Sequence, residues 1–277
     1  MTGELLYHYT SIESLHKILL GDGENIVLRA THANFMNDPD EFEFANKIIT
    51  KTLLEYESEN SVLEKKSDNL FGKGGIFGSF AYLPGEPFIL SLSEHQDDLS
   101  MWRAYGHDGN GVCIGLDKEM LKSYSEDPEV INTTLLECEY RKEIVENHFR
   151  KYWINNYNDF KIEKSEDGRI TTGFNDGSIF FSMPKYGFSA KSPSYGSEAE
   201  WRLCTNEGKN YQFRTKGNLF VPFIEHKFRK EILKKIVIGP CLNGLQVEQG
   251  MRFFLKKFGF PEAKAFIERS QISYRQV

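Results

Sequence analysis

The stretch LYHYTSIESLHKILL, residues 6–20, carries the change of secondary structure that decides the fold. Leu5–Tyr9 is short and rich in apolar and aromatic residues, as strands are. Ser11 follows closely and offers the side chain of a helix N-cap. The predicted helix Ser14–Leu20 has apolar residues at helical spacing, at positions 12, 15, 18 and 19. A strand that passes almost directly into a helix favours a fold of alternating strands and helices.

The alternation continues outward from this stretch. The helix is predicted to end at Gly21-Asp22-Gly23, followed by a strand at Asn25–Thr31, a turn at Asn37-Asp38-Pro39 and a helix at Asp40–Glu57. Farther along, the predicted strands are Pro87–Glu94, Gly111–Leu116, Leu135–Arg141, Ser197–Thr205, Lys235–Gly239 and Ala263–Ile267. The predicted helices are Asp97–Tyr105, Lys118–Tyr124, Glu143–Tyr157 and Gly244–Lys257. We therefore predict one α+β domain over residues 1–277, with surface insertions near 58–86 and 158–176.

Composition bounds the classes of function. The chain has 277 residues, 40% of them hydrophobic and 14% aromatic, which is enough to bury a substantial core. Its net charge is -6 and its pI is about 5.7, so no broad cationic surface is expected. This argues against a scaffold that wraps nucleic acid, but not against a nucleic-acid substrate held in a small basic groove.

Cysteine usage and hydropathy predict a cytoplasmic protein. The four cysteines are far apart and form no CxxC pair, and no apolar signal segment is present at the start of the sequence. No run approaches the roughly 20 apolar residues of a spanning helix. We expect reduced thiols and no membrane anchor.

The sequence lacks the motifs of several classes of enzyme. The seven histidines include no HExxH pair, so no metal site is predicted. There is no G-x-S-x-G elbow, and the first strand is not followed by G-x-G-x-x-G. The segment GKGGIFGS, residues 72–79, lacks the spacing and ending of a phosphate-binding loop.

His8 stands where the first strand ends. A strand end beside a helix N-terminus can present a side chain and backbone N–H groups to an anionic ligand, which suggests a nucleotide site. The alternative is a hydrogen-bonded strand histidine, with Tyr7 and Tyr9 as packing residues. Taken alone, the residues favour the second interpretation.

A resemblance to a known family favours the nucleotide site over the structural histidine. Six segments resemble the bacterial domain of unknown function 2971 family as a set over nearly the whole chain: YHYTSIESLHKIL (7–19), NFMNDPDEFEF (34–44), SLSEHQDDLSMWRAYGHDGNGVCIGLD (91–117), EAEWR (198–202), KKIVIGP (234–240) and SQISYR (270–275). The first segment is also similar to the opening strand and helix of ADP-ribosyltransferase-like folds. This similarity implies a mixed-sheet core with helical insertions.

The resemblance implies three roles. In ADP-ribosyltransferase-like enzymes an early strand supplies a His or Arg for a ribose of NAD, a middle strand supplies a hydroxyl residue, and a late strand supplies a Glu. His8 takes the first role here, Ser91 or Ser93 the second, and Glu200 the third. His8 and Glu200 are thus the predicted catalytic residues. Glu200 would bind the ribose 2′-hydroxyl, stabilise an oxocarbenium-like state and assist as a base.

The same resemblance names the remaining cofactor-binding candidates, with NAD as the substrate and no metal. Arginines are candidates for the pyrophosphate because a guanidinium grips phosphate oxygens through two bonds. Aromatic residues are candidates for stacking on nicotinamide, with packing in the core as the alternative for the two on the short helix. The candidates are Tyr9, Thr10, Arg29, Ser91, Ser93, Trp102, Arg103, Tyr105 and Arg202.

Glu200 also has a structural alternative, an ion pair with Arg202. Glu198 lies two residues earlier, so on a strand both carboxylates would face the same side. A Glu-x-Glu pair resembles arginine-directed ADP-ribosyltransferases, although solvated strands also carry such pairs.

Two functions follow. The first is an NAD-dependent ADP-ribosyltransferase or NAD-cleaving relative, a bacterial toxin or antiphage effector that modifies nucleic acid or protein and has an antitoxin or defence partner. The second is a non-catalytic module that senses a nucleotide or a partner. Glu200 discriminates between them: in an enzyme it should line the pocket that contains His8, and in a binding module it can be paired away with an arginine.

Overall fold

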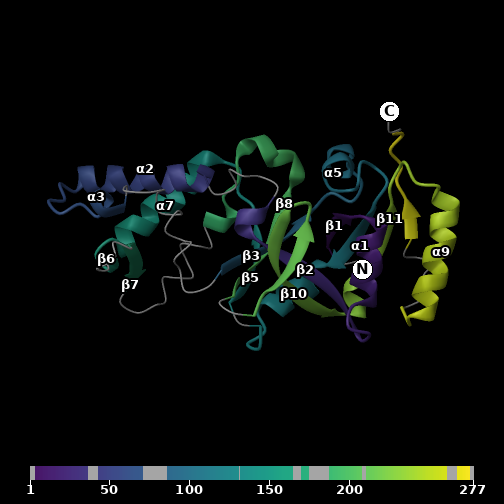
Figure 1. Cartoon of the computed structure of the whole chain (residues 1–277). Helices are drawn as coiled ribbons and strands as arrows, with labels where there is room; N and C mark the ends of the chain where they lie inside the picture. Colours follow the sequence, from purple (N-terminus) through teal and green to yellow (C-terminus); the bar gives the residue numbers. More distant parts are fainter. Residues whose placement is uncertain are drawn as a thin grey trace.

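The computed structural model describes residues 4–36, 43–70, 86–130, 132–164, 170–174, 187–207, 210–260 and 267–274. These residues form a ten-stranded mixed sheet with helices around it and a separate two-stranded hairpin, so the α+β class is confirmed (Figure 1). The strands of the large sheet are β1 (Leu5–Thr10), β2 (Asn25–His32), β3 (Glu86–Ser93), β4 (Val112–Asp117), β5 (Thr133–Glu137), β8 (Glu200–Glu207), β9 (Gln212–Lys216), β10 (Leu219–Arg229), β11 (Leu233–Ile238) and β12 (Ile267–Arg269).

The helices lie between these strands along the chain. The α-helices are α1 (Ile12–Leu20), α2 (Glu43–Glu59), α3 (Ser67–Leu70), α5 (Leu99–Ala104), α6 (Lys118–Ser125), α7 (Lys142–Asn156) and α9 (Gly244–Lys257). Short 3-10 turns are η1 (Ala33–Phe35), η4 (Pro193–Glu198) and η5 (Lys230–Ile232). The hairpin consists of β6 (Phe160–Lys164) and β7 (Ile170–Phe174).

The opening stretch folds as its sequence predicts. Ser11 caps α1, and its Oγ accepts the backbone N–H of Ser14 at 3.1 Å. The helix ends at Gly21, which has a φ of +49°. A Cβ there would lie 1.8 Å from the carbonyl oxygen of Asn25. Only glycine fits this turn, and it returns the chain directly into β2.

The strand order of the sheet is β12-β11-β4-β1-β3-β2-β10-β9, and β8 pairs with both β3 and β5. Apart from the parallel pair β11–β12, the pairs are antiparallel. The main core lies against this sheet and includes apolar residues of α1 and α9, such as Leu15, Leu19, Met251 and Leu255.

β3 is the strand at which the sheet forks. β8 pairs with β3 over the whole of its length, from Glu86 to Ser93, and so occupies one edge. The other edge is shared: β2 pairs at Phe88 and Ile89, and β1 pairs at Ser93 alone. Because a strand has only two edges, β1 and β2 must diverge beside the middle of β3. The fork leaves room for side chains between them.

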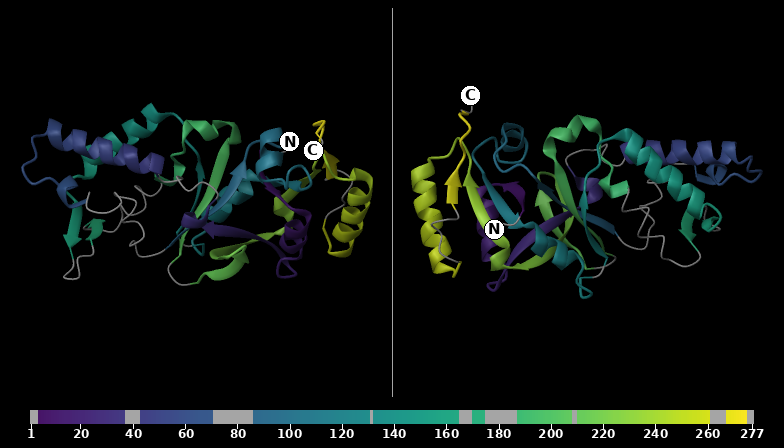
Figure 2. Two further views of the ribbon diagram at one scale, coloured as in Figure 1. Left: turned by 45° about the horizontal axis from the view of Figure 1, so that its top comes forward. Right: turned by 180° about the vertical axis from the view of Figure 1, so that it is seen from behind.

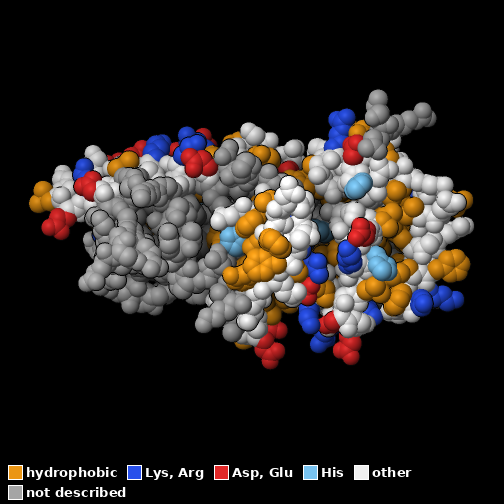
Figure 3. Space-filling view, viewed as in Figure 1, with side chains coloured by type: hydrophobic (Ala, Val, Ile, Leu, Met, Phe, Trp, Pro, Cys, Tyr) orange, Lys and Arg blue, Asp and Glu red, His pale blue; other side chains and the backbone are white. Residues whose placement is uncertain are grey.

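A second packed region projects away from the sheet (Figures 1 and 2). Here α2 and α7 share a core of their own, which includes Ile49, Leu53, Phe149 and Trp153. We call this region, with α3, β6 and β7, the helical lobe. Ion pairs such as Lys51 with Glu146 join its two long helices, and acidic and basic side chains alternate along its outer edge in Figure 3.

Several predicted boundaries differ from the observed elements. α9 matches its prediction, whereas the helix predicted from Asp40 is described from Glu43. The Asn37-Asp38-Pro39 turn, residues 71–85 and most of Ala263–Ile267 lie outside the described residues. The strands β9 and β10 were not predicted at all, since Pro222 in the middle of β10 is a residue that strands usually exclude.

In the described part of the chain, no helix combines the length and the apolar character needed to cross a membrane.

Candidate functional site

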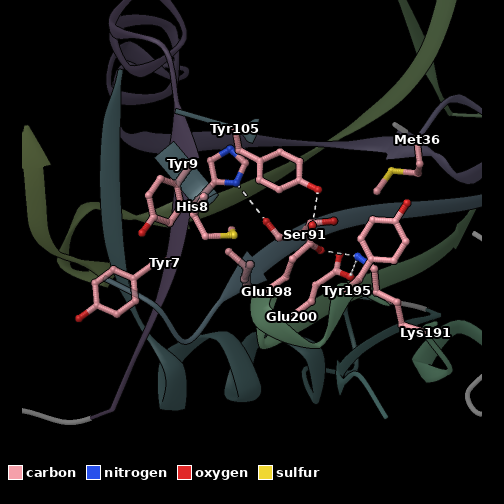
Figure 4. A pocket seen from close by; sticks show the side chains of 12 residues that line it. Tyr7, His8, Tyr9, Met36, Ser91, Tyr105, Lys191, Tyr195, Glu198 and Glu200 are labelled. Atoms are coloured by element: carbon pink, nitrogen blue, oxygen red, sulfur yellow. Dashed lines mark hydrogen bonds and ion pairs between the residues drawn. The ribbon is translucent and has the colours of Figure 1, made fainter. Parts of the chain in front are cut away.

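A pocket of about 160 Å³ opens at the fork between β1 and β3 (Figure 4). Its walls come from β1, β3, α5, the turn after β2 and the segment that leads into β8. The lining residues are Tyr7, His8, Tyr9, Met36, Ser91, Leu92, Met101, Tyr105, Lys191, Tyr195, Glu198 and Glu200. His8 and Glu200, which are 192 positions apart, therefore line one cavity. The volume accommodates a ring-sized group and not a whole dinucleotide.

The imidazole of His8 takes the place of a strand–strand hydrogen bond at the edge of β3. Its Nδ1 lies 3.1 Å from the carbonyl oxygen of Ser91, on the part of β3 that neither β1 nor β2 pairs with. A carbonyl only accepts hydrogen bonds, so Nδ1 carries the proton. The Nε2 of the neutral ring then carries a lone pair and can accept a hydrogen bond. Burial lowers the pKa of His8, against a smaller opposing effect of the Ser91 carbonyl. His8 thus presents an acceptor atom at neutral pH.

Glu200 is the buried anion of the site, with 5% of its side chain exposed. Its Oε2 accepts from Lys191 Nζ at 2.7 Å and from Arg202 Nη2 at 2.8 Å. Burial alone would raise the pKa of Glu200, but the charges of Arg202 and Lys191 outweigh it and lower the pKa to about 2. Among the described residues no side chain donates to Oε1. This oxygen is open to a ligand.

Lys191 links the two carboxylates of the pocket. Its Nζ lies 2.5 Å from Glu198 Oε2 and 2.7 Å from Glu200 Oε2 (Figure 4). The other oxygen of Glu198 accepts from the hydroxyl of Tyr105 at 2.7 Å. A continuous polar chain therefore runs from α5 through Glu198, Lys191 and Glu200 to Arg202. It fixes three walls of the pocket relative to one another.

The carboxylates of Glu198 and Glu200 do lie close together, but not because both residues are on one face of a strand, as the sequence suggested. Glu198 is the last residue of η4 and not part of a strand, and β8 begins at Glu200. Ala199 between them has left-handed backbone angles, with φ at 40°. Such a conformation is strained for a residue with a Cβ and turns the chain sharply. The turn and the shared Lys191 bring the carboxylates together.

The two serines of β3 have different surroundings. Ser93 Oγ donates to the carbonyl of Glu198 at 2.6 Å and accepts the N–H of His95 at 3.0 Å. Ser91 lines the pocket, and its buried Oγ has no hydrogen-bond partner among the described residues. Buried hydroxyls are usually satisfied, so the Ser91 hydroxyl is a third polar atom available to a ligand.

Of the three candidate aromatic residues, two line the pocket and one packs behind it. Tyr9 and Tyr105 line the pocket. Trp102 is fully buried, donates its Nε1–H to Asp97 at 2.6 Å and packs edge-on against Tyr9, with ring centroids 4.8 Å apart. Trp102 therefore takes the packing role that the sequence left open. It supports the pocket through Tyr9.

The candidate phosphate ligands lie elsewhere. Arg29 is bonded to Glu225 on the surface of β2 and β10, and Arg103 bonds the hydroxyl of Tyr274. Arg202 is fully buried behind Glu200 and donates to the carbonyl of Phe188. None of these arginines lines the pocket, nor does Thr10. Lys191 is the cation that does, and its charge is shared by two carboxylates.

Sequence reasoning missed Lys191, Tyr195 and the apolar lining residues Met36, Leu92 and Met101. The segment KSPSYGSEAE, residues 191–200, carries three charged lining residues and Tyr195 within ten positions. Its nearness to Glu200 is the one sequence signal that marks it. Lys191 is held by the backbone of Glu139 and by the carboxylates of Glu198 and Glu200, and the sequence does not display these contacts.

Within the described residues, no group of three or more His, Cys, Asp and Glu side chains is arranged to hold a metal ion.

The pocket presents acceptor atoms more than charge. His8 Nε2 and Glu200 Oε1 both accept hydrogen bonds, and the Ser91 hydroxyl can donate or accept. Apart from these three residues and the Lys191–Glu198 ion pair, the described lining residues are aromatic or apolar. A fitting ligand carries a ring-sized group with hydrogen-bond donors, such as the hydroxyls of a sugar.

Residues 101–203 match a family model described as a protein of unknown function (DUF2971). The matched segment extends from α5 into β8 and contains Tyr105, Lys191, Glu198 and Glu200, whereas His8 and Ser91 precede it. The predicted resemblance to this family is thus confirmed over residues 101–203, and over the rest of the chain it stays a prediction. Neither a curated protein nor a solved structure matches the chain. The relation to ADP-ribosyltransferases stays a prediction.

Proposed function

We propose that this protein cleaves the nicotinamide–ribose bond of NAD and transfers ADP-ribose to a nucleic acid or protein acceptor. One observation carries the proposal: His8 and Glu200, far apart in the sequence, line the same pocket, and each has one acceptor atom without a partner among the described residues. Both atoms suit the hydroxyl donors of a ribose. The proposal includes the role of a toxin or defence effector with a partner that restrains it.

Glu200 acts in this proposal as an anion. When the bond breaks, nicotinamide leaves with the bonding electron pair and the ribose carbon becomes oxocarbenium-like. The carboxylate stabilises that positive charge while Oε1 accepts the 2′-hydroxyl. With a pKa of about 2, Glu200 is a weak base, so the proton of the incoming acceptor passes to solvent water. The expectation that Glu200 assists as a base is therefore dropped from the mechanism.

The size of the pocket suits one half of the dinucleotide. About 160 Å³ suits the nicotinamide ring or its ribose, with Tyr9 and Tyr105 as aromatic walls. The pyrophosphate must lie outside this cavity, because the arginines named as candidates do not reach it. We therefore expect nicotinamide riboside to compete with NAD for the pocket.

The test is nicotinamide release from NAD by the wild-type protein and by Glu200→Gln, with and without nucleic-acid and protein extracts. We expect release by the wild type, its loss in Glu200→Gln, and ADP-ribose on one class of macromolecule. Glu57→Gln is the matched control, because Glu57 is also a buried glutamate but lies in the helical lobe. If the wild-type protein neither releases nicotinamide nor binds NAD, the proposal fails.

The ion pairs of Glu200 favour a second function, that of a non-catalytic binding module. Two cations and the Cys138 thiol already approach its Oε2, which is the arrangement expected of a binding module. In that case the protein senses a nucleotide or partner without cleaving it. Calorimetry that detects NAD binding by the wild type, without nicotinamide release under any condition, would support this function instead.

A further inference from the structure

Lys191 is a lysine that lies inside the protein, with 5% of its side chain exposed. Its ammonium lies between Glu198 and Glu200 and is 4.9 Å from the centre of the Tyr195 ring. Burial of a lysine is costly unless its charge is paired. The two carboxylates provide that pairing, and the ring adds a favourable cation–π contact.

Among the described residues, the charged groups at bonding distance around Lys191 are two anions and two cations. Glu198 and Glu200 contribute two negative charges, and Lys191 and Arg202 contribute two positive charges at bonding distance. Without Lys191, one buried cation would face two neighbouring carboxylates. Like charges at close range disfavour ionisation, so one carboxyl would retain its proton at a higher pH.

We infer that Lys191 is the positioning residue of this site: it holds Glu198 beside Glu200, keeps Glu200 ionised and engages Glu200 through Oε2, which leaves Oε1 for the ligand. The assignment of Oε1 to a sugar hydroxyl rests on the proposed function. The role of Lys191 in holding the pair does not.

The backbone around Lys191 is fixed independently of its side chain. The N–H of Lys191 donates to the carbonyl of Glu139 at 3.1 Å, and the N–H of Glu139 donates to the carbonyl of Ser189 at 2.7 Å. Ala190 forms a β-bridge with Glu139. A substitution at Lys191 therefore removes the ammonium and leaves the segment attached to the end of β5.

Other titratable groups face the carboxylate pair from the elements packed around it. Tyr105 comes from the end of α5 and donates to Glu198. Cys138 and Tyr140 follow β5, and both contact Glu200. Burial raises the pKa of each of these three side chains, so they stay neutral at pH 4–8. His8 lines the same pocket and is neutral near pH 7. The carboxylates are thus the groups that respond when Lys191 is removed.

The experiment measures urea unfolding of the wild type, Lys191→Met and Lys191→Arg between pH 4 and pH 7. In Lys191→Met a carboxyl of the pair has a raised folded-state pKa, so its contribution to stability is present below the unfolded value near 4.3 and is lost as pH rises. The urea midpoint of Lys191→Met should therefore fall further below that of the wild type as pH increases. Lys191→Arg should restore most of the difference.

Lys17→Met is the control, since Lys17 forms an exposed ion pair with Glu13 and should give a difference that stays small at every pH. A deficit of Lys191→Met that is the same at every pH would mean that Lys191 only fills space, and the inference would be overturned.

Turnover separates this inference from the proposed function. If the wild type releases nicotinamide, the acidic limb of its pH profile is set by His8. In Lys191→Met a carboxyl that keeps its proton at a higher pH should add to that limb and shift it to higher pH, and Lys191→Arg should keep the wild-type limb. An unmoved limb would contradict the inference. If the wild type releases no nicotinamide, the proposed function fails, and the urea series still decides the role of Lys191.

Discussion

Two buried glutamates, one in each part of the molecule, show how a structural carboxylate differs from one at a site. Glu57 lies in the helical lobe and is 1% exposed. Its Oε1 accepts from the backbone N–H of Ser67 at 3.1 Å and from the Tyr157 hydroxyl at 2.7 Å, and its Oε2 accepts from the Ser67 hydroxyl. Both oxygens are bonded, and the residue joins α2 to α3 and to the end of α7.

Glu200, by contrast, has partners on one oxygen only in the part of the chain that the structure describes. Its partners are two cations and a thiol, all at Oε2, and its other oxygen belongs to a residue that lines a cavity. Both carboxylate oxygens of Glu57 have hydrogen-bond partners within the fold. Glu200 is held in place through Oε2, whereas its Oε1 has no partner among the described residues. An atom that the fold fixes but does not satisfy is a good indicator of a ligand position.

The histidines repeat the contrast. His226 is buried, with Nδ1 at 3.1 Å from the Tyr124 hydroxyl and Nε2 at 3.3 Å from the Thr205 hydroxyl. His8 has one ring nitrogen on the Ser91 carbonyl, while the described residues offer no partner to the other. The comparison therefore assigns His226 to the fold and His8 to the site.

The largest expected effect tests the two glutamates against each other. Glu200→Gln should lower nicotinamide release by about a thousandfold, because the charge that stabilises the transition state is lost. Glu57→Gln should keep the wild-type rate and instead lower the free energy of unfolding by about 1–3 kcal/mol, as a buried group loses a partner. Rates and urea midpoints of both variants check this. Equal loss of activity in the two variants would remove the distinction.

The sequence predicted the elements whose causes are local. α1 is determined by the Ser11 cap and by apolar residues at helical spacing, and α9 by a clear amphipathic pattern. The hydrogen bond of His8 to the β3 backbone is a property of the sheet, and the placement of Lys191 depends on its contacts with Glu139, which follows β5, and with Glu200 of β8. Neither leaves a periodic pattern in the sequence. Arg29 became a phosphate candidate through its residue type, although a cross-strand partner, Glu225, already neutralises it.

The next effect concerns the stability of the fold at acid pH. Burial lowers the pKa of His226 to about 4, below the ordinary value of 6.5. Between these values the unfolded chain binds a proton that the folded chain refuses, so stability is lost as pH falls from about 6.5 towards 4, by up to about 3 kcal/mol. Unfolding by urea across this range measures the loss. His226→Phe should remove this part of the pH dependence, and an unchanged slope in that variant would assign it to other groups.

His8 should show its effect in turnover more than in stability. His8→Asn should lower turnover by about tenfold to a hundredfold, the effect of one hydrogen bond to a bound group. The lowered pKa of His8 predicts a rate that is level from pH 8 to about 6.5 and falls only below that range, where the ring takes up a proton. A pH series of initial rates tests this. A rate that rises as the ring becomes protonated would mean that the imidazolium is the active form.

The smallest effects distinguish the two serines. Ser93→Ala removes two hydrogen bonds and should cost about 1–2 kcal/mol of stability. Ser91→Ala removes a hydroxyl without a partner among the described residues, so its stability should stay within about 0.5 kcal/mol of the wild type while NAD binding weakens. Urea midpoints and calorimetric titrations separate the two outcomes. A Ser91→Ala protein that binds NAD as the wild type does would exclude Ser91 from the ligand site.

The most direct test of the account is the ¹⁵N spectrum of the histidine rings, recorded at pH 7 with and without a carbocyclic NAD analogue that cannot be cleaved. His8→Asn assigns the His8 signals. We predict a neutral His8 with its proton on Nδ1, an Nε2 signal that shifts when the analogue donates a hydrogen bond to it, and no change at His226. A doubly protonated His8, or an Nε2 signal that stays in place at saturating analogue, would contradict the claim that the open atoms of this pocket bind NAD.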